Sequence, residues 1–147
     1  MITSAETQKP VTISPFRRAA FRCYQWALVL FLMAGVVQIF LAGLGIFSLR
    51  GQEIGVPGET VLNPHRTLGF ALGPAALAIL VLALAARAGT RAIILSVVLL
   101  LLTGLVQSLL VSLADNHAIF GGLHAADGLL ILGIPAYLYV RSRRRES

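Results

Sequence analysis

The sequence predicts an all-α integral membrane protein, a four-helix bundle built from two parallel helix-pair repeats. The first supporting observation is composition: 57% of the 147 residues are hydrophobic, 12% are charged, and the mean hydropathy is +0.85. A soluble domain of this length would need more polar surface. The second is a set of four long apolar runs, and the third is a motif that recurs between them. The alternating pattern of barrel strands is absent from the sequence, so helices are the structure that satisfies every backbone group in lipid.

Each apolar run is long enough to cross about 30 Å of hydrocarbon as a helix. We place the four spans near residues 24–48, 64–86, 92–114 and 118–140. The connections are a loop at 49–63, a tight turn "RAGTR" at 87–91 and a short polar turn "DNH" at 115–117. Because these connections are short, consecutive helices are expected to pack as antiparallel neighbours. The chain then divides into a basic N-terminal segment (1–23), a transmembrane domain (24–140) and a basic tail (141–147).

Lysine and arginine predict the direction of the bundle in the membrane. The side that holds both termini carries Lys9, Arg17, Arg18, Arg22, Arg87, Arg91, Arg141, Arg143, Arg144 and Arg145, and the other side carries Arg50 and Arg66. The positive-inside rule therefore predicts a multi-pass protein of the cytoplasmic (plasma) membrane with both termini in the cytoplasm. Aromatic rings are expected at the cytoplasmic interface, at Tyr24, Trp26, Tyr137 and Tyr139. The arginines lie at the ends of apolar runs, so we expect the lipid bilayer and no nucleic acid as a partner.

Two short motifs indicate an internal repeat. "GVVQIFLAGL" (35–44) in the first span and "GLVQSLLVSL" (104–113) in the third both read G-x-V-Q-x-x-L-x-x-L. "HRTLG" (65–69) in the second span and "HAADG" (124–128) in the fourth both read H-x-x-x-G. Each copy runs in the same direction across the membrane, so the two copies are expected to be related by an axis along the membrane normal.

This repeat predicts a polar layer that holds a haem group. It places His65 and His124 on parallel, diagonally opposite helices in the outer half of the bundle, where Gln38 and Gln107 also lie. Two facing imidazoles are suitable axial ligands for haem b in a bundle core. The remaining candidate cofactor-binding residues have supporting roles. The macrocycle would lie against the backbone of the glycines, and its propionates would lie near the arginines. The glutamines would orient the imidazole rings. These residues are Gly69, Gly128, Arg66, Arg50, Gln38 and Gln107.

Each residue of this layer also has a plainer interpretation. Asn63 and Pro64 resemble a helix N-cap and first helical residue, which would place His65 in the first turn, close to water. Gly69 begins a G-x-x-x-G packing motif, and Asp127 can make an interhelical hydrogen bond.

Other residues leave the identity of a bound group open. His117 lies one heptad before His124 and is an alternative partner for His65. Two histidines can bind zinc or copper, although no Cys or Met cluster supports this. The single cysteine, Cys23, excludes an internal disulfide.

At "NPHRTLG" and "LHAADGLL" the chain resembles two families. Over about residues 24–140 it resembles a family of small actinobacterial four-helix membrane proteins of unknown function. More distantly, it resembles one four-helix half of the haem A synthase family, which implies haem ligation by His65 and His124. This chain has one half instead of two, and the candidates for an acidic residue in the first outer loop are Glu53 and Glu59. The resemblance therefore implies a bound haem b and not catalysis on haem.

Three functions follow from these observations. The first is a small cytochrome b-like protein with bis-histidine haem ligation and no catalytic residue, which transfers electrons to or from quinone or a membrane redox complex. The second is a cofactor-free accessory subunit or assembly factor of a membrane complex. The third, which four short helices with one intramembrane carboxylate support least, is a transporter or channel with a proton relay through Asp127 and the histidines.

Overall fold

The computed structural model describes residues 14–49 and 58–144, and all of the regular structure in these segments is helical. Four helices in this part of the chain are long and apolar enough to cross a membrane, which confirms the four predicted spans. The elements in chain order are α1 (Pro15–Leu49), α2 (Gly58–Ala85), α3 (Thr90–Leu101), the π-helical turn η1 (Leu102–Val106), α4 (Gln107–Ala114) and α5 (Ala118–Arg143). The third span is one continuous helix made of α3, η1 and α4, because helical backbone angles continue through both junctions.

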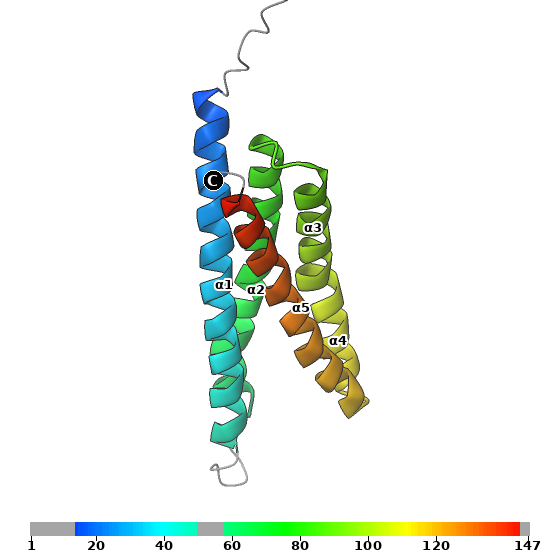
Figure 1. Cartoon of the computed structure of the whole chain (residues 1–147). Helices are drawn as coiled ribbons and strands as arrows, with labels where there is room; N and C mark the ends of the chain where they lie inside the picture. Colours follow the sequence, from blue (N-terminus) through cyan, green and yellow to red (C-terminus); the bar gives the residue numbers. More distant parts are fainter. Residues whose placement is uncertain (1–13, 50–57, 145–147) are drawn as a thin grey trace, which may run out of the picture.

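The helices form a ring in which each packs against the next (Figure 1). α1 lies along α2, α2 along α3, α4 along α5, and α5 returns to α1. Figure 1 shows α5 crossing the bundle obliquely: it begins beside α4 and ends beside α1. α2 and α5 are therefore diagonal partners, as the repeat predicts for the helices that carry His65 and His124.

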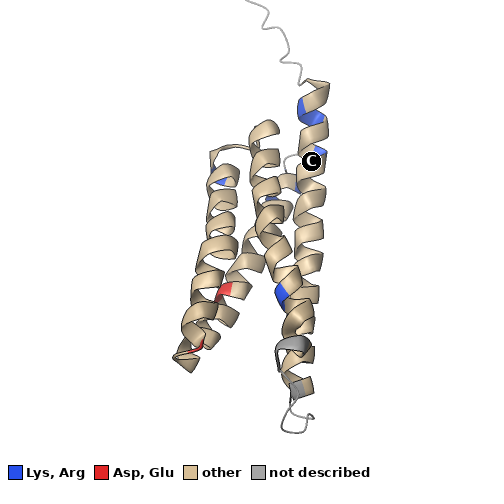
Figure 2. Cartoon of the chain, turned by 180° about the vertical axis from the view of Figure 1, so that it is seen from behind, with Lys and Arg blue, Asp and Glu red and all other residues tan. Residues whose placement is uncertain are grey.

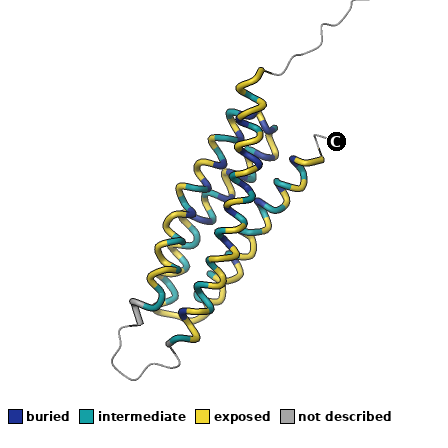
Figure 3. Tube along the Cα trace, turned by 90° about the vertical axis from the view of Figure 1, so that its left-hand side faces the viewer, coloured by how far each residue is buried: buried dark blue, intermediate teal, exposed yellow. Residues whose placement is uncertain are grey.

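We call the end at which α1 begins and α5 ends the terminal end, and the opposite end the distal end. The apolar core fills the terminal half of the bundle, whereas the distal half is less deeply buried (Figure 3). Small residues such as Ala76, Ala83 and Ala92 let the helix backbones approach there, and Tyr24, Leu28 and Leu99 fill the space between them. Many large apolar side chains outside this core are exposed, which is the surface expected of a protein solvated by lipid.

One glycine lies where α5 crosses α1. A Cβ atom built on Gly35 would overlap the Leu132 side chain, so a larger residue there would require that side chain to move. The corresponding glycine of the second repeat, Gly104, lies in η1 and has no neighbour within 4 Å of such an atom. The repeated glycine is thus a packing residue in the first copy alone.

The structure corrects two expectations about local structure. α2 begins at Gly58, so Pro64 lies inside the helix, Asn63 is not its N-cap, and His65 is two turns from the helix start. The bilayer-length apolar run determined the expected boundary, but the helix extends beyond that run. Tyr24 is 1% exposed and belongs to the core, because small residues at the α2–α3 turn leave room for its ring, whereas Trp26 is exposed as expected of an interfacial ring.

Charge is unevenly distributed between the two ends of the molecule, with Arg66 as a basic residue in the distal half (Figure 2). Among the acidic residues whose side chains the structure describes, Asp115 and Asp127 both belong to the distal half of the α4–α5 pair. The opposite end carries the arginines of the α1 start, the α2–α3 turn and the α5 end. Arg17 donates from Nε to the carbonyl oxygen of Ala86 at 3.0 Å, which ties the start of α1 to the α2–α3 turn.

Candidate functional site: two glutamine–histidine pairs

The polar side chains that the sequence singles out come together in the distal half of the bundle. Gln38 of α1 meets His65 of α2, and Gln107 of α4 meets His124 of α5. The two pairs are brought close to one another by α2 and α5, whose histidine rings are neighbours. We call Gln38, His65, Gln107, His124 and Asp127 the polar layer.

In the first pair, glutamine and histidine bond each other's backbone. The side-chain Nε2 of Gln38 donates to the carbonyl oxygen of His65 at 2.8 Å, and Nδ1 of His65 lies 3.1 Å from the carbonyl oxygen of Gln38. A carbonyl oxygen can only accept, so Nδ1 of His65 carries the proton, and its Nε2 can accept a longer hydrogen bond from Nε2 of Gln38, which lies 3.5 Å away. Histidines that ligate metals usually donate their other ring N–H to such a partner, which fixes the tautomer and the ring orientation.

The second pair repeats the glutamine bond but not the histidine bond. Nε2 of Gln107 donates to the carbonyl oxygen of His124 at 3.1 Å. In contrast, Nδ1 of His124 is buried without a hydrogen-bond partner in the described part of the chain. The repeat inferred from sequence therefore corresponds to one hydrogen bond that both helix pairs make. The two histidine rings differ, because Nδ1 has a hydrogen-bond partner in His65 and none in His124 in the described structure.

The glycine of each H-x-x-x-G motif lies beside the glutamine amide that donates to the carbonyl oxygen of the histidine. In a helix, the Cβ atom of residue i+4 leans over the preceding turn and covers the carbonyl of residue i. A Cβ atom built on Gly69 would lie 3.0 Å from Nε2 of Gln38, and one built on Gly128 would lie 4.0 Å from Nε2 of Gln107. Gly69 therefore leaves room for the glutamine amide, whereas 4.0 Å at Gly128 is an ordinary contact distance that a Cβ atom would also allow. Gly73, the other half of the expected G-x-x-x-G motif, has no neighbour within 4 Å of a built Cβ atom.

The two imidazole rings face each other across the bundle. Their centres are 6.3 Å apart and their planes are inclined by 72°. His117 is not part of this arrangement, because it is the exposed N-cap of α5 and its ring lies against Phe120 instead. Among the described residues, no group of three or more His, Cys, Asp or Glu side chains could hold a metal ion. A site here therefore offers two protein ligands, and the metal's other ligands would come from a cofactor.

Asp127 adds the one carboxyl group of the polar layer. It is 6% exposed, it interacts with the Gln107 side chain and His124, and its Oδ2 atom is buried without a hydrogen-bond partner in the described structure. The repeat places Leu68 at the corresponding position of the first pair. Arg66, one residue beyond His65, is exposed and stays free to contact charge at the edge of the layer.

Sequence reasoning missed two features of this region. The π-helical turn at Leu102–Val106 lies directly before Gln107, and no pattern in the sequence predicts it. Such turns are rare and are often found at functional sites. A second missed feature is Arg91 of α3, which donates to the phenol oxygen of Tyr137 on α5 at 3.2 Å, at the terminal end. The basic residue and the interfacial ring are visible in the sequence, but their contact depends on how α5 crosses the bundle.

Comparison with known proteins adds a family but no function. The sequence profile of a family of unknown function, DUF6220, matches residues 38–114, slightly more than half of the chain. The matched segment begins at Gln38 and includes His65, Gly69 and Gln107, and it ends before His124. Comparisons with curated proteins and with solved structures give no significant match.

Proposed function

Because the chain belongs to DUF6220, a family whose function is unknown, we propose a function from the polar layer itself: the protein binds one haem b through His65 and His124 and transfers electrons in the membrane. The observation that carries this proposal is the 6.3 Å between the two ring centres. Two imidazoles on opposite sides of one metal ion have centres about 6 Å apart, since each metal–nitrogen bond is about 2 Å and each ring centre lies about 1 Å beyond its nitrogen.

The surroundings of the rings support the same proposal. The bond from Nδ1 of His65 makes Nε2 the nitrogen that would ligate, in exchange for its long 3.5 Å contact with the Gln38 amide. The inclination of 72° is compatible with two rings that both stand upright on a macrocycle, because each ring can turn about its own metal–nitrogen bond. A two-ligand site suits haem better than zinc, because the macrocycle supplies the four other nitrogens. Bound in this way, haem b would take up and release one electron, and Arg66 would contact a propionate.

The proposed setting is the plasma membrane, with both termini cytoplasmic and quinone or a membrane redox complex as the electron partner. The concentration of arginines at the terminal end supports this orientation. Labelling with an impermeant thiol reagent tests it in a Cys23→Ser background. Asn116→Cys, in the distal turn, should react from outside intact cells, and Thr90→Cys should react only after lysis. The reverse pattern would contradict the orientation and move the polar layer to the cytoplasmic half.

Optical absorption tests the haem proposal directly. The wild-type chain, produced with ample haem, is expected to purify with a Soret band and about one haem per chain. His65→Ala or His124→Ala should shift that band by removing one axial ligand, and the double variant should lose it. His117→Ala is the matched control and should leave the spectrum unchanged. A folded, monodisperse and colourless wild-type protein would overturn the proposal.

A second candidate function is a cofactor-free accessory subunit or assembly factor. It is favoured by the two glutamine bonds, because they explain Gln38, Gln107 and Gly69 as residues that hold the helix pairs together. In that case the protein should be colourless, and His65→Ala and His124→Ala should leave it folded. Pull-down from cells in mild detergent should recover the same membrane partner with the wild type and lose it with variants of the polar layer.

A further inference from the structure

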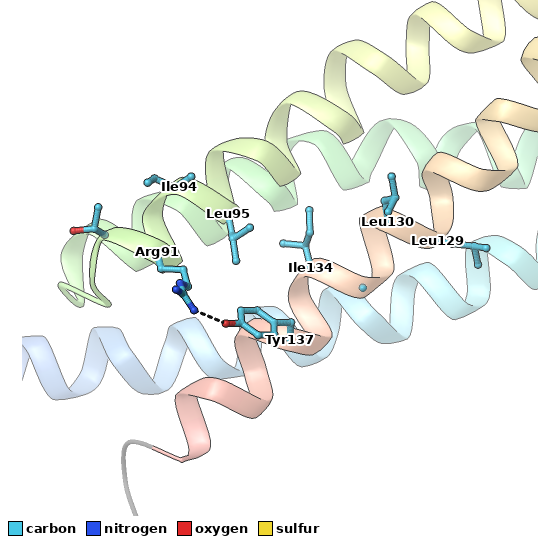
Figure 4. Close-up of a pocket in the computed structure, with 9 residues that line it drawn as sticks. Arg91, Ile94, Leu95, Leu129, Leu130, Ile134 and Tyr137 are labelled. Atoms are coloured by element: carbon cyan, nitrogen blue, oxygen red, sulfur yellow. Dashed lines mark hydrogen bonds between the residues drawn. The ribbon is translucent and has the colours of Figure 1, made fainter.

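The face between α3 and α5 carries an open groove that the polar layer does not use. It has a volume of about 790 Å³, within the rough 300–1,000 Å³ range of ligand sites. Its apolar walls come from α3 and α5, and Figure 4 shows Leu95 and Ile134 pointing toward one another from the two helices. Gly133 forms part of the floor, and a Cβ atom built there would have no neighbour within 4 Å. The groove therefore owes part of its depth to a missing side chain.

Arg91 lines the terminal end of this groove, and Arg141 lies next to it, in contact with the lining residue Tyr137. Arg91 of α3 donates to the phenol oxygen of Tyr137 at 3.2 Å (Figure 4), and Arg141 of α5 donates to the same oxygen at 3.3 Å. Each guanidinium has five N–H donors, so these bonds leave most of them available. Among the side chains that the structure describes, the carboxylates lie in the distal half and none is near this pair. The phenol thus holds two positive charges beside each other at the end of an apolar groove.

We propose that this groove binds an anionic phospholipid, with an acyl chain between α3 and α5 and the phosphate at Arg91 and Arg141. The charge complementarity identifies the ligand: the apolar walls suit a hydrocarbon chain, and two guanidiniums suit a phosphate that can accept from both. Basic pockets between transmembrane helices are known to recognise anionic headgroups in this way. The site is separate from the polar layer and does not depend on haem.

Native mass spectrometry of the full chain in detergent tests this inference, with phosphatidylglycerol and phosphatidylcholine of identical acyl chains as probes. The wild type should retain phosphatidylglycerol about tenfold better than phosphatidylcholine. Arg91→Gln with Arg141→Gln should remove that preference, and each single substitution should remove part of it. Gly133→Leu fills the groove and should lower retention of both lipids. Arg22→Gln, which removes an exposed charge from the same end, and Gly122→Leu, on the exposed distal part of α5, are the matched controls.

Several outcomes would overturn the inference. One is equal retention of the two lipids by the wild type. Another is a loss of the phosphatidylglycerol preference in Arg22→Gln that is as large as in the Arg91→Gln, Arg141→Gln variant. Both results would mean that the attraction is unspecific. Displacement of phosphatidylglycerol by glycerol phosphate alone would show a headgroup site without an acyl-chain groove. Displacement by a quinone without a phosphate would assign the groove to that ligand. Tyr137→Phe keeps the ring and both charges, so it should lower the preference less than loss of the arginines.

Discussion

The α1–α2 pair and the α4–α5 pair make the same glutamine-to-carbonyl hydrogen bond. They differ in the hydrogen bonds of the other polar atoms in each pair. In the first pair the bond is 2.8 Å long, and His65 returns a bond from its ring to the Gln38 backbone. In the second pair it is 3.1 Å long, and Nδ1 of His124 and Oδ2 of Asp127 are buried without a partner in the described structure, whereas the first pair has one such atom, Oε1 of Gln38. Burying polar atoms without hydrogen-bond partners destabilises a fold, so such atoms indicate a functional role, such as binding a ligand. We infer that the first pair supplies structure and the second pair supplies adjustable chemistry.

The largest expected contrast comes from deleting one residue at matched positions of the repeat. Leu105 lies in the π-helical turn and Val36 occupies the same place in regular α1; both are exposed. A π turn carries one residue more than an α turn, so deleting Leu105 restores α-helix and keeps both flanks on their faces. Deleting Val36 rotates the rest of α1 by about 100°. We expect a folded, monodisperse ΔLeu105 protein in size-exclusion chromatography and aggregated ΔVal36; similar behaviour of both would contradict the comparison.

The next contrast concerns the repeated glycine before each glutamine. Gly35→Leu should destabilise the protein by about 1–3 kcal/mol, because the new side chain must displace Leu132 at the α1–α5 crossing. Gly104→Leu meets open space and should cost less than about 0.5 kcal/mol. Thermal unfolding in detergent measures both. Adding Leu132→Ala to Gly35→Leu should recover part of the loss, and no recovery would mean that this contact does not set the crossing.

A smaller effect is expected at Asp127, where the repeats differ in sequence. Asp127→Asn keeps the shape of the side chain and replaces a buried ionisable carboxyl by a neutral amide, so it should raise stability by about 1 kcal/mol. Thermal unfolding at neutral pH checks the sign. Ser142→Ala, another buried polar position on α5, serves as the control and should not stabilise, because its hydroxyl is hydrogen bonded. Destabilisation by Asp127→Asn would show that the carboxylate is a structural partner of Gln107.

The smallest contrast compares the two glycines after the histidines. Alanine is favoured over glycine in a helix by about 1 kcal/mol. At Gly128 that gain should appear, because the new Cβ atom lies 4.0 Å from the Gln107 amide. At Gly69 the distance is 3.0 Å, so the Gln38 bond should weaken and cancel the gain. Gly69→Ala should therefore be about 1 kcal/mol less stable than Gly128→Ala. Equal stabilities would show that the glutamine amides adjust freely.

The sequence predicts the fold well because bilayer thickness and apolar run length determine where helices form. It also places Gln38, His65, Gln107 and His124 in one layer, since polar residues in spans are rare enough for a repeat to be recognised. It does not predict the interhelical bonds themselves, the burial of Tyr24 or the early start of α2, because these depend on how neighbouring helices pack and not on local pattern. Haem ligation by His65 and His124 stays a prediction.

The hydrogen bonds of the first pair also imply an order of assembly. Gln38 and His65 are 27 residues apart along the chain and belong to one hairpin, as do Arg17 and Ala86 at its other end. Such a hairpin can close both of its ends during synthesis, before α3 leaves the ribosome. The approach of His124 to His65 must wait for the last helix. We therefore expect α1–α2 to form first in the membrane, and the second hairpin to pack against it and complete the polar layer last.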